Sequence, residues 1–216
     1  HRDGKDEAGA RHCRTTQAST KVYCAKRDAK LTRQTLTASV EEGGLLVLAP
    51  DPVVPYAKAA YEQQQTFWLA PGASLVAVDW VGAGRVSRGE RWAFSSFSSC
   101  NQVFRARFDD HPLSKGNLLG RDIVAQQPDA SPLVIDAVRM QGGADGPVRL
   151  GLDLGLATHN SAITVLCSGA DSIDVCRRLR AAASALADRR AGARPGVLKQ
   201  IELAVVLAPT RIAAVT

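Results

Sequence analysis

The amino-acid sequence predicts a mainly β fold with one clear α-helix. Short runs of β-branched or alternating apolar and polar residues recur between turn signals, roughly every 10–15 residues, as in strand-rich domains. A later segment changes to the three- and four-residue spacing of an amphipathic helix. The chain has 216 residues, of which 45% are hydrophobic and 22% charged, so it can bury a sizeable core. We therefore expect residues 1–216 to form a single domain.

The predicted strands share an apolar or alternating pattern that is bounded by turn-forming residues. In chain order they are Thr15–Tyr23, Leu31–Val40, Leu45–Leu48, Thr66–Leu69, Ser74–Trp80, Val103–Phe108, Leu133–Val138, Leu150–Leu156, Ala162–Cys167 and Leu203–Leu207. Between two of them, Pro71-Gly72 offers a fixed φ followed by a residue that accepts positive φ, as a type II turn requires. We expect this turn to close a hairpin flanked by Leu69 and Ser74.

Two prolines interrupt the segment Asp51-Pro52-Val53-Val54-Pro55. Proline donates no backbone hydrogen bond, and it is therefore confined to sheet edges, strand ends and bulges. We expect this segment to form a rigid extended loop or an edge on the surface, rather than part of a central strand.

The helical segment begins after Asp171 and Ser172, either of which can serve as its N-cap. Its apolar residues recur at helical spacing, and a glycine and a proline follow that would end it. These signals predict a helix over about residues 173–190. We expect residues 1–12 and 189–200 to be mobile.

The charge distribution disfavours a nucleic-acid-binding protein, and the short apolar runs disfavour a membrane protein. The net charge of +6 is uneven, because residues 1–40 and 177–216 carry an excess of basic residues and residues 41–176 an excess of acidic ones. Most aromatic residues lie in the acidic middle, whereas nucleic-acid binding favours basic and aromatic residues on one patch. The apolar runs are of strand length, well short of the roughly 18 residues that a membrane span requires.

The cysteines indicate neither a disulfide framework nor a structural zinc site. The chain has five cysteines, an odd number. They are widely spaced, and no two form a Cys-x-x-Cys pair. This usage favours a reducing compartment. His12-Cys13 and Cys24 offer imidazole and thiol groups to nickel, copper or zinc, but no motif fixes a coordination geometry.

Motifs of catalysis are incomplete in this sequence. Gly82-Ala83-Gly84 starts like a dinucleotide fingerprint, but Ser87 stands where the third glycine belongs. No Walker A sequence occurs, so we do not expect this chain to hydrolyse nucleotides. Cys100 together with a histidine, His111 or His159, could form a thiolate–imidazolium pair, which leaves a Cys-dependent hydrolase as one alternative.

The densest cluster of charged and aromatic residues runs from Asp79 to Phe94. One interpretation is a hairpin whose arginines pair with Asp79 and Glu90. Its core would then contain Trp80, Trp92 and Phe94. The other interpretation is that these charges line a partner surface or a polar passage, where ion pairs supply specificity more than stability. The partner-binding arginines of this second interpretation are Arg85, Arg88 and Arg91.

Four stretches, in this order and spacing, resemble the UreD family of urease accessory proteins, called UreH in some bacteria. They are Thr15 to Tyr23, Asp51 to Tyr56, Pro71-Gly72-Ala73-Ser74-Leu75 running into Asp79-Trp80, and Gly84-Arg85 through Arg88-Gly89-Glu90-Arg91-Trp92-Ala93-Phe94. The likeness is good over about residues 9–105 and diffuse beyond Arg107. The family usually has a Gly-Gly-x-x-Gly-Gly-Asp stretch before its Thr-Thr-Gln motif and a further helix at its end, so the chain resembles a member truncated at both ends.

The resemblance implies a cytoplasmic scaffold or chaperone rather than an enzyme, with a β-solenoid or helical sheet fold and one or two α-helices. Such members bind the urease apoprotein and the accessory proteins F and G, of which G is a GTPase, and assist nickel insertion into urease. No tightly bound cofactor is implied, only transient nickel. Carboxylate, water and imidazole ligands suit transient Ni²⁺ transfer. The candidate residues of an internal nickel route are Asp51, Asp79 and Glu90.

A generic β-rich protein-interaction module, unrelated to urease, is the other alternative. It would have the same strand pattern and the same lack of catalytic motifs. It differs from the urease interpretation in its partners, because it would not copurify with a urease subunit or with the F protein.

Overall fold

The computed structural model describes residues 10–24, 31–105, 131–142, 148–149, 161–179, 181–182 and 203–207. The strands are β1 (Arg11–Thr15), β2 (Thr20–Val22), β3 (Thr32–Val40), β4 (Leu45–Ala49), β5 (Val53–Pro55), β6 (Ala60–Leu69), β7 (Ser74–Gly82), β8 (Ser96–Arg105), β9 (Pro132–Gln141), β10 (Val148–Arg149), β11 (Ser161–Ser168) and β12 (Leu203–Leu207). Two short 3₁₀ helices are η1 (Val86–Arg88) and η4 (Ala170–Ser172), and an α-helix covers residues 173–179 and 181–182. The prediction of a mainly β fold is confirmed.

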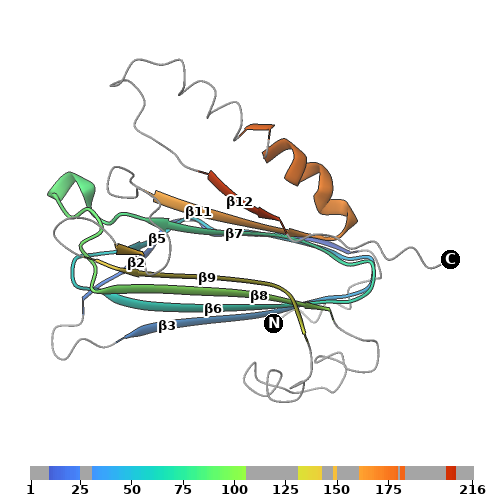
Figure 1. Ribbon diagram of the computed structural model, residues 1–216, viewed down its shortest axis with the longest axis horizontal. Coiled ribbons are helices and arrows are strands. Elements are labelled where there is room, and N and C mark those ends of the chain that lie inside the picture. Colours follow the sequence, from blue (N-terminus) through green and yellow to red (C-terminus); the bar gives the residue numbers. More distant parts are fainter. Residues whose placement is uncertain are drawn as a thin grey trace.

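The described strands form two sheets that face each other (Figure 1). One sheet has seven strands, in the order β1-β4-β7-β11-β12 with β2 and β5 alongside, and the other has five, in the order β10-β9-β8-β6-β3. From β3 to β8 the chain passes back and forth between the sheets, and each strand pairs in parallel with the one a winding earlier. This is the winding of a β-solenoid, as expected. Later strands β9 and β11 pair antiparallel with β8 and β7.

The turn at Pro71-Gly72 forms as predicted but does not close a hairpin. Gly72 has φ +74°, and the Ala73 N–H donates to the Ala70 carbonyl at 3.0 Å, which is the hydrogen bond of a β-turn. The strands on either side, β6 and β7, belong to different sheets. The hairpin prediction was wrong because turn chemistry fixes the local reversal and leaves open which sheet the next strand joins.

The segment from Asp51 to Pro55 was predicted to be an extended loop or an edge. It instead contains a strand, β5, that is not at an edge, so this prediction was wrong. β5 pairs with β2 on one side and with β7 on the other. The prolines are tolerated because Pro52 precedes the strand and Pro55 ends it. The carbonyl of Pro52 accepts a hydrogen bond from the Thr20 N–H at 3.0 Å, so this ladder position needs an acceptor rather than a donor.

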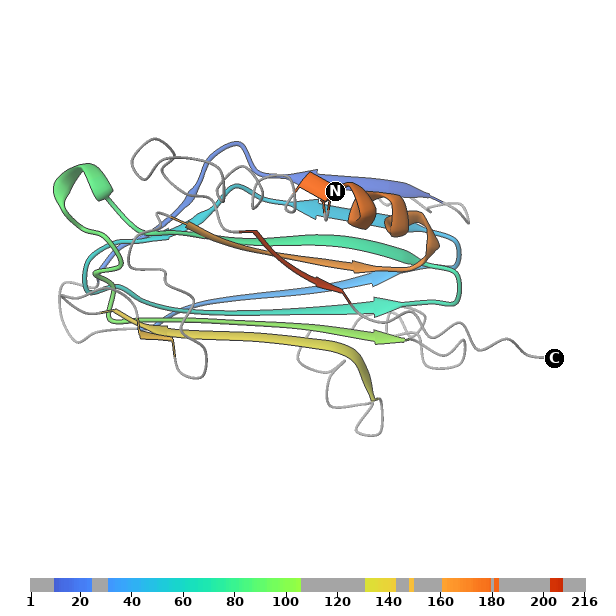
Figure 2. The ribbon, with the colours of Figure 1, turned by 45° about the horizontal axis from the view of Figure 1, so that its top comes forward.

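The helix that begins at Ile173 packs on the outer face of the seven-stranded sheet, away from the five-stranded sheet (Figure 2). Its Cys176 is buried against Val76, Val165 and Cys167. The remainder of the predicted helix, up to residue 190, lies outside the described residues. Of the segments expected to be mobile, Arg11 and His12 begin β1, whereas residues 1–9 and 189–200 are also outside the described part. No helix in the described part of the chain is long and apolar enough to cross a bilayer.

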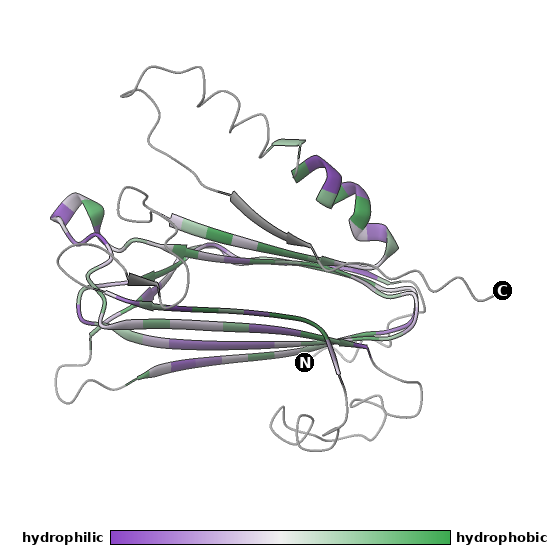
Figure 3. Cartoon of the chain, viewed as in Figure 1, coloured by the Kyte–Doolittle hydropathy of each residue, from purple (hydrophilic) through white to green (hydrophobic). Residues whose placement is uncertain are grey.

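Two hydrophobic clusters fill the two ends of the space between the sheets. The first contains Val22, Val53, Ala59, Tyr61, Val81, Ala83, Trp92, Phe94, Phe97 and Met140. The second contains Val40, Phe67, Leu69, Ala73, Leu75, Ala77, Val103 and Leu166. Polar residues interrupt the strands of the five-stranded sheet along their length (Figure 3). Three of them, Gln63, Ser99 and Asn101, are buried, so the middle of the interior is not apolar.

The turn from β11 to η4 requires a glycine. Gly169 has φ +90°, and a Cβ atom there would lie 2.4 Å from the Ala73 carbonyl oxygen and 2.5 Å from the Ser74 hydroxyl oxygen. Gly89 at the end of η1 has a similar φ of +76°, but a Cβ atom there would meet nothing within 4 Å. Both positions have a positive φ, but Gly89, with ψ 7°, is left-handed helical, whereas Gly169, with ψ 164°, lies in a region essentially restricted to glycine and alone adds a steric clash.

We expect Gly169→Ala to lower the free energy of unfolding by about 2 kcal/mol or more, since the strain and the clash add. Gly89→Ala, the matched control, should cost only about 1 kcal/mol for the strain. Urea denaturation of the two variants and the unchanged chain measures the difference. Equal losses for both variants would contradict the steric argument.

Candidate functional site

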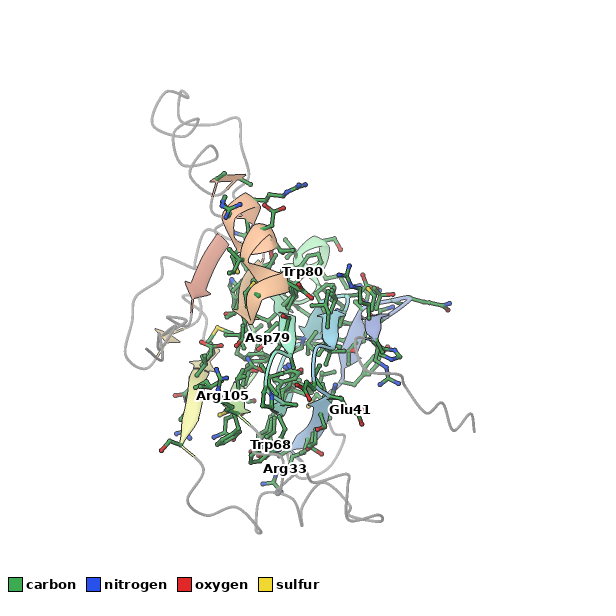
Figure 4. All side chains as sticks on the ribbon, turned by 90° about the vertical axis from the view of Figure 1, so that its right-hand side faces the viewer. Arg33, Glu41, Trp68, Asp79, Trp80 and Arg105 are labelled. Carbon is green, nitrogen blue, oxygen red and sulfur yellow. The ribbon has the colours of Figure 1, made fainter. Side chains whose placement is uncertain are left out.

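Polar side chains meet in the middle of the sandwich, between the two hydrophobic clusters. Asp79 comes from β7 in the seven-stranded sheet, and Gln63, Ser99, Asn101 and Asp136 come from β6, β8 and β9 in the five-stranded sheet. We call these five residues the interior polar layer. Figure 4 labels Asp79 between the sheets, with the next residue, Trp80, nearer the helix.

The Asp79 carboxylate links the two sheets through three hydrogen bonds. Its Oδ1 accepts from Gln63 Nε2 at 3.1 Å, and its Oδ2 accepts from Asn101 Nδ2 at 3.0 Å and from the Ser99 hydroxyl. Asn101 Nδ2 also donates to Asp136 Oδ2 at 3.3 Å, so one amide serves two carboxylates. The other end of that amide, Asn101 Oδ1, is buried without a hydrogen-bond partner.

A buried tyrosine extends the network toward the edge of the five-stranded sheet. The Tyr61 hydroxyl lies 2.8 Å from Gln34 Oε1 and 3.0 Å from Gln63 Oε1. Burial, and then the negative charge of Asp79, raise the pKa of Tyr61 far above its ordinary value. Tyr61 therefore keeps its proton, and because a hydroxyl has one hydrogen it donates to one of the two amide oxygens at a time.

The chemistry of this layer is that of hard oxygen ligands. Carboxylate, amide and hydroxyl oxygens are suitable ligands for divalent cations. A site with few charged ligands binds such a cation weakly and releases it readily. Within the described residues no group of three or more His, Cys, Asp or Glu side chains is placed to hold a metal ion. The layer is a network of hydrogen-bonded polar side chains between the two hydrophobic clusters.

A second cluster lies at the surface, in residues 83–92, which we call the Arg85 loop. Arg85 Nε donates to Glu90 Oε2 at 2.9 Å, and Arg85 Nη2 donates to Glu90 Oε1, so the ion pair is bidentate. The Ala57 N–H also donates to Glu90 Oε2, at 3.3 Å. The Arg85 hydrogen bonds hold the pKa of Glu90 below its ordinary value, and Glu90 in turn raises the pKa of Arg85.

The three carboxylates of the predicted nickel route have separate hydrogen-bond partners. Asp51, in the break between β4 and β5, accepts from Thr16 Oγ1 at 3.1 Å, and its own N–H donates to Thr16 Oγ1 at 2.7 Å. Asp79 is in the interior polar layer, and Glu90 is in the Arg85 loop. Arg88 is exposed on η1, and Arg91 is half-buried.

The segment from Asp79 to Phe94 does not form a hairpin, because β7 and the next strand, β8, belong to different sheets. The contacts of that interpretation are correct in part. Glu90 does pair with an arginine, and Trp92 and Phe94 are in the first hydrophobic cluster, whereas Trp80 is half-buried and outside it. Asp79, in contrast, accepts its hydrogen bonds from amide and hydroxyl groups across the sandwich.

Sequence reasoning missed the partners of Asp79. A signal was present, because side chains two apart on a strand share a face. On β8, Ser99 and Asn101 have the same parity as Phe97 and Val103, which are core residues. Polar residues on the core-facing side of a strand indicate a buried polar network.

Cys100, the candidate nucleophile, has the properties of an ordinary half-buried thiol. Burial, and then the charge of Asp136, raise its pKa, and Arg139 only partly offsets this. An activated nucleophile needs a lowered pKa. The two histidines predicted as its partners, His111 and His159, lie outside the described residues.

Comparison with known proteins gives consistent matches. The family model described as "UreD urease accessory protein" matches residues 4–211. Urease accessory protein D of Oryza sativa subsp. indica is 46% identical over 99 residues, which are 46% of this chain and 31% of that protein. Urease accessory protein UreD of Sorangium cellulosum is 52% identical over 97 residues, 45% of this chain and 30% of that protein.

A longer match is with urease accessory protein UreD 2 of Streptomyces griseus subsp. griseus, which is 31% identical over 137 residues. The matched residues make up 63% of this chain and 39% of the Streptomyces protein. The chain therefore spans less than a third of the length of the rice and Sorangium relatives that it matches, and 39% of the Streptomyces one.

Thiol labelling tests the Cys100 alternative. With iodoacetamide at neutral pH we expect the exposed Cys13 and Cys24 to react first and Cys100 more slowly, because its pKa is raised. Cys167 should react least, since burial and a hydrogen bond with Cys176 raise its pKa to about 12. Faster labelling of Cys100 than of the exposed thiols, read by mass spectrometry, would contradict this assignment.

The Arg85–Glu90 pair should give the Arg85 loop a pH-dependent stability. The folded-state pKa of Glu90 is lowered, so its contribution is complete above the unfolded pKa of about 4.3 and is lost as the pH falls through the folded value. Glu90→Gln should therefore lower the urea midpoint at pH 7, and the difference should shrink at acid pH. Glu62→Gln, which disrupts the exposed Arg33–Glu62 pair, should change the midpoint little. A Glu90→Gln difference that is the same at acid and neutral pH would contradict the pairing.

Proposed function

Because this chain belongs to the UreD family of urease accessory proteins, we propose that it is a cytoplasmic scaffold or chaperone, not an enzyme, that assists nickel insertion into the urease active site. The single observation that carries this proposal is the family match over residues 4–211. Its partners are the urease apoprotein and the accessory proteins F and G. The G protein, as a GTPase, supplies the nucleotide hydrolysis for which this chain has no Walker A sequence.

Nickel is the cargo in this proposal and passes along the interior polar layer. The position of Asp79 supports this route, because its carboxylate offers a charged oxygen ligand between the sheets. The two ends of that space are filled by the hydrophobic clusters. The partnerless Asn101 Oδ1 adds a buried acceptor beside it. Borderline Ni²⁺ exchanges among oxygen ligands faster than it leaves a thiolate cage.

The other predicted residues have surface roles in the same proposal. Asp51 and Glu90 lie at the break between β4 and β5 and in the Arg85 loop, where they provide carboxylates outside the interior. Arg85, Arg88 and Arg91 contribute to partner binding. The bidentate pair with Glu90 holds Arg85 in one orientation, which suits a recognition surface.

Replacing Asp79 tests the nickel route. In cells that contain a matched urease apoprotein and the F and G proteins, Asp79→Asn should lower nickel-dependent urease activity at least severalfold, because the charge is lost. Copurification with the partners should persist. The exposed Asp174→Asn on the helix, which removes the same charge from a surface ion pair, is the control and should leave activation unchanged.

Stability must be measured in parallel, because Asp79→Asn leaves buried donors without an acceptor. This should cost about 1–3 kcal/mol of unfolding free energy, so urea curves must show the variant to be folded at the assay temperature. Unchanged activation by a folded variant would overturn the interior route. Failure of the unchanged chain to copurify with any urease protein would overturn the scaffold proposal itself.

A further inference from the structure

Two tyrosines and an arginine are stacked at the surface beside the Arg85 loop. The rings of Tyr23 and Tyr56 meet edge to face, with centroids 5.1 Å apart and planes at 83°. The Arg85 guanidinium carbon lies 4.4 Å from the centroid of the Tyr56 ring, in cation–π geometry. Tyr23 is nevertheless 66% exposed, more than any other large hydrophobic residue of the described part. An aromatic ring is thus held in place at the surface without being covered.

The stack is fixed from several sides. The Tyr56 N–H donates to the Val22 carbonyl at 3.0 Å, which ties it to the residue before Tyr23. Glu90 holds Arg85 from the other side through the bidentate pair. Little side-chain entropy remains to be lost when a partner covers these groups.

The base of the Arg85 loop is anchored in the core. The Trp92 N–H donates to the Ala83 carbonyl, and both residues are buried in the first hydrophobic cluster. The Gly89 N–H donates to the Val86 carbonyl at 3.0 Å and closes η1. The loop therefore presents its outer residues from a rigid support.

Two exposed residues near the stack, Lys21 and Arg88, carry positive charge. Lys21 is exposed two residues before Tyr23, on the same side of the extended chain. Arg88 is exposed on η1 and lies near enough to Glu90 for its charge to lower the Glu90 pKa. The carboxylate in this region, Glu90, is already paired with Arg85. An approaching surface of negative charge would meet the exposed cations Lys21 and Arg88.

We propose that Tyr23, Tyr56 and Arg85, with Lys21 and Arg88, form a docking surface for an acidic segment of a protein partner. Tyrosine and arginine are the residues that most often supply binding energy at protein interfaces, particularly when they are preorganised. This inference rests on the proposed function, because a scaffold must bind protein partners, and it names the site and the chemistry of one of them.

A protein fits this surface better than a nucleic acid does. Binding of single strands uses successive exposed aromatic rings on which bases stack. Of the exposed large hydrophobic residues in the described part of the chain, Tyr23 is the one aromatic. Arg85 covers one face of the Tyr56 ring.

The test is the affinity of the purified full chain for the matched urease apoprotein and F protein, measured by biolayer interferometry. Tyr23→Ala should weaken binding about tenfold or more. Arg88→Glu should weaken it mainly through a slower association rate, and this loss should shrink at high salt. Arg33→Glu, the same reversal at an exposed arginine on β3, should have little effect. Urea curves check that all variants are folded.

The outcomes separate this inference from the function on which it rests. If the unchanged chain binds and both Tyr23→Ala and Arg88→Glu bind equally well, the docking surface is wrong and the scaffold proposal stands. If the unchanged chain binds neither the urease apoprotein nor the F protein, both the docking surface and the scaffold proposal are wrong. Salt-sensitive binding of a labelled single-stranded oligonucleotide that Arg88→Glu abolishes, with urease-protein binding unaffected, would replace the acidic protein segment by nucleic acid.

Discussion

The hydrogen bonds of the half-buried Asp79 carboxylate are the interaction that sets the internal arrangement of this molecule. A charge between two sheets is costly to desolvate unless donors surround it. Here the donors come from two neighbouring strands whose parallel register places Gln63 opposite Ser99. A shift of one residue between β6 and β8 would turn these side chains to the other face. The hydrogen bonds of Asp79 and the register of the five-stranded sheet therefore depend on each other.

The same polar residues explain where the sequence prediction succeeded and failed. The alternation of apolar residues correctly located β3, β4, β7, β9 and β11. For β6 and β8, however, only the last residues from Thr66 and from Val103 were predicted, because Gln63 to Gln65 and Ser98 to Gln102 interrupt the apolar pattern. The strands continue through these polar stretches because the residues are satisfied by one another inside the sandwich. The interior polar layer was thus missed because its residues are polar, and the strand prediction relied on apolar residues.

The surface contacts could be predicted only where they are local. Arg85 and Glu90 are five residues apart, and their pairing follows from the sequence. Thr16 and Asp51 are 35 residues apart and meet because they lie one winding of the solenoid apart. The same winding brings Tyr23 next to Tyr56. The successive windings have no visible sequence repeat, so these contacts could be found only from the pairing of β1 with β4 and of β2 with β5.

A continuous series of packed rings connects the base of the Arg85 loop to Tyr61, beside the interior polar layer. Trp92, at the base of the Arg85 loop, contacts Phe94, which contacts Phe97, and Phe97 stacks on Tyr61 with ring centroids 5.7 Å apart. Contact alone does not transmit a change, since coupling requires an element with two discrete arrangements. The Tyr61 hydroxyl has one proton and two amide acceptors, and the amide of one of them, Gln63, donates to Asp79. The series of rings therefore ends at a hydroxyl that is linked to the Asp79 carboxylate through the amide of Gln63.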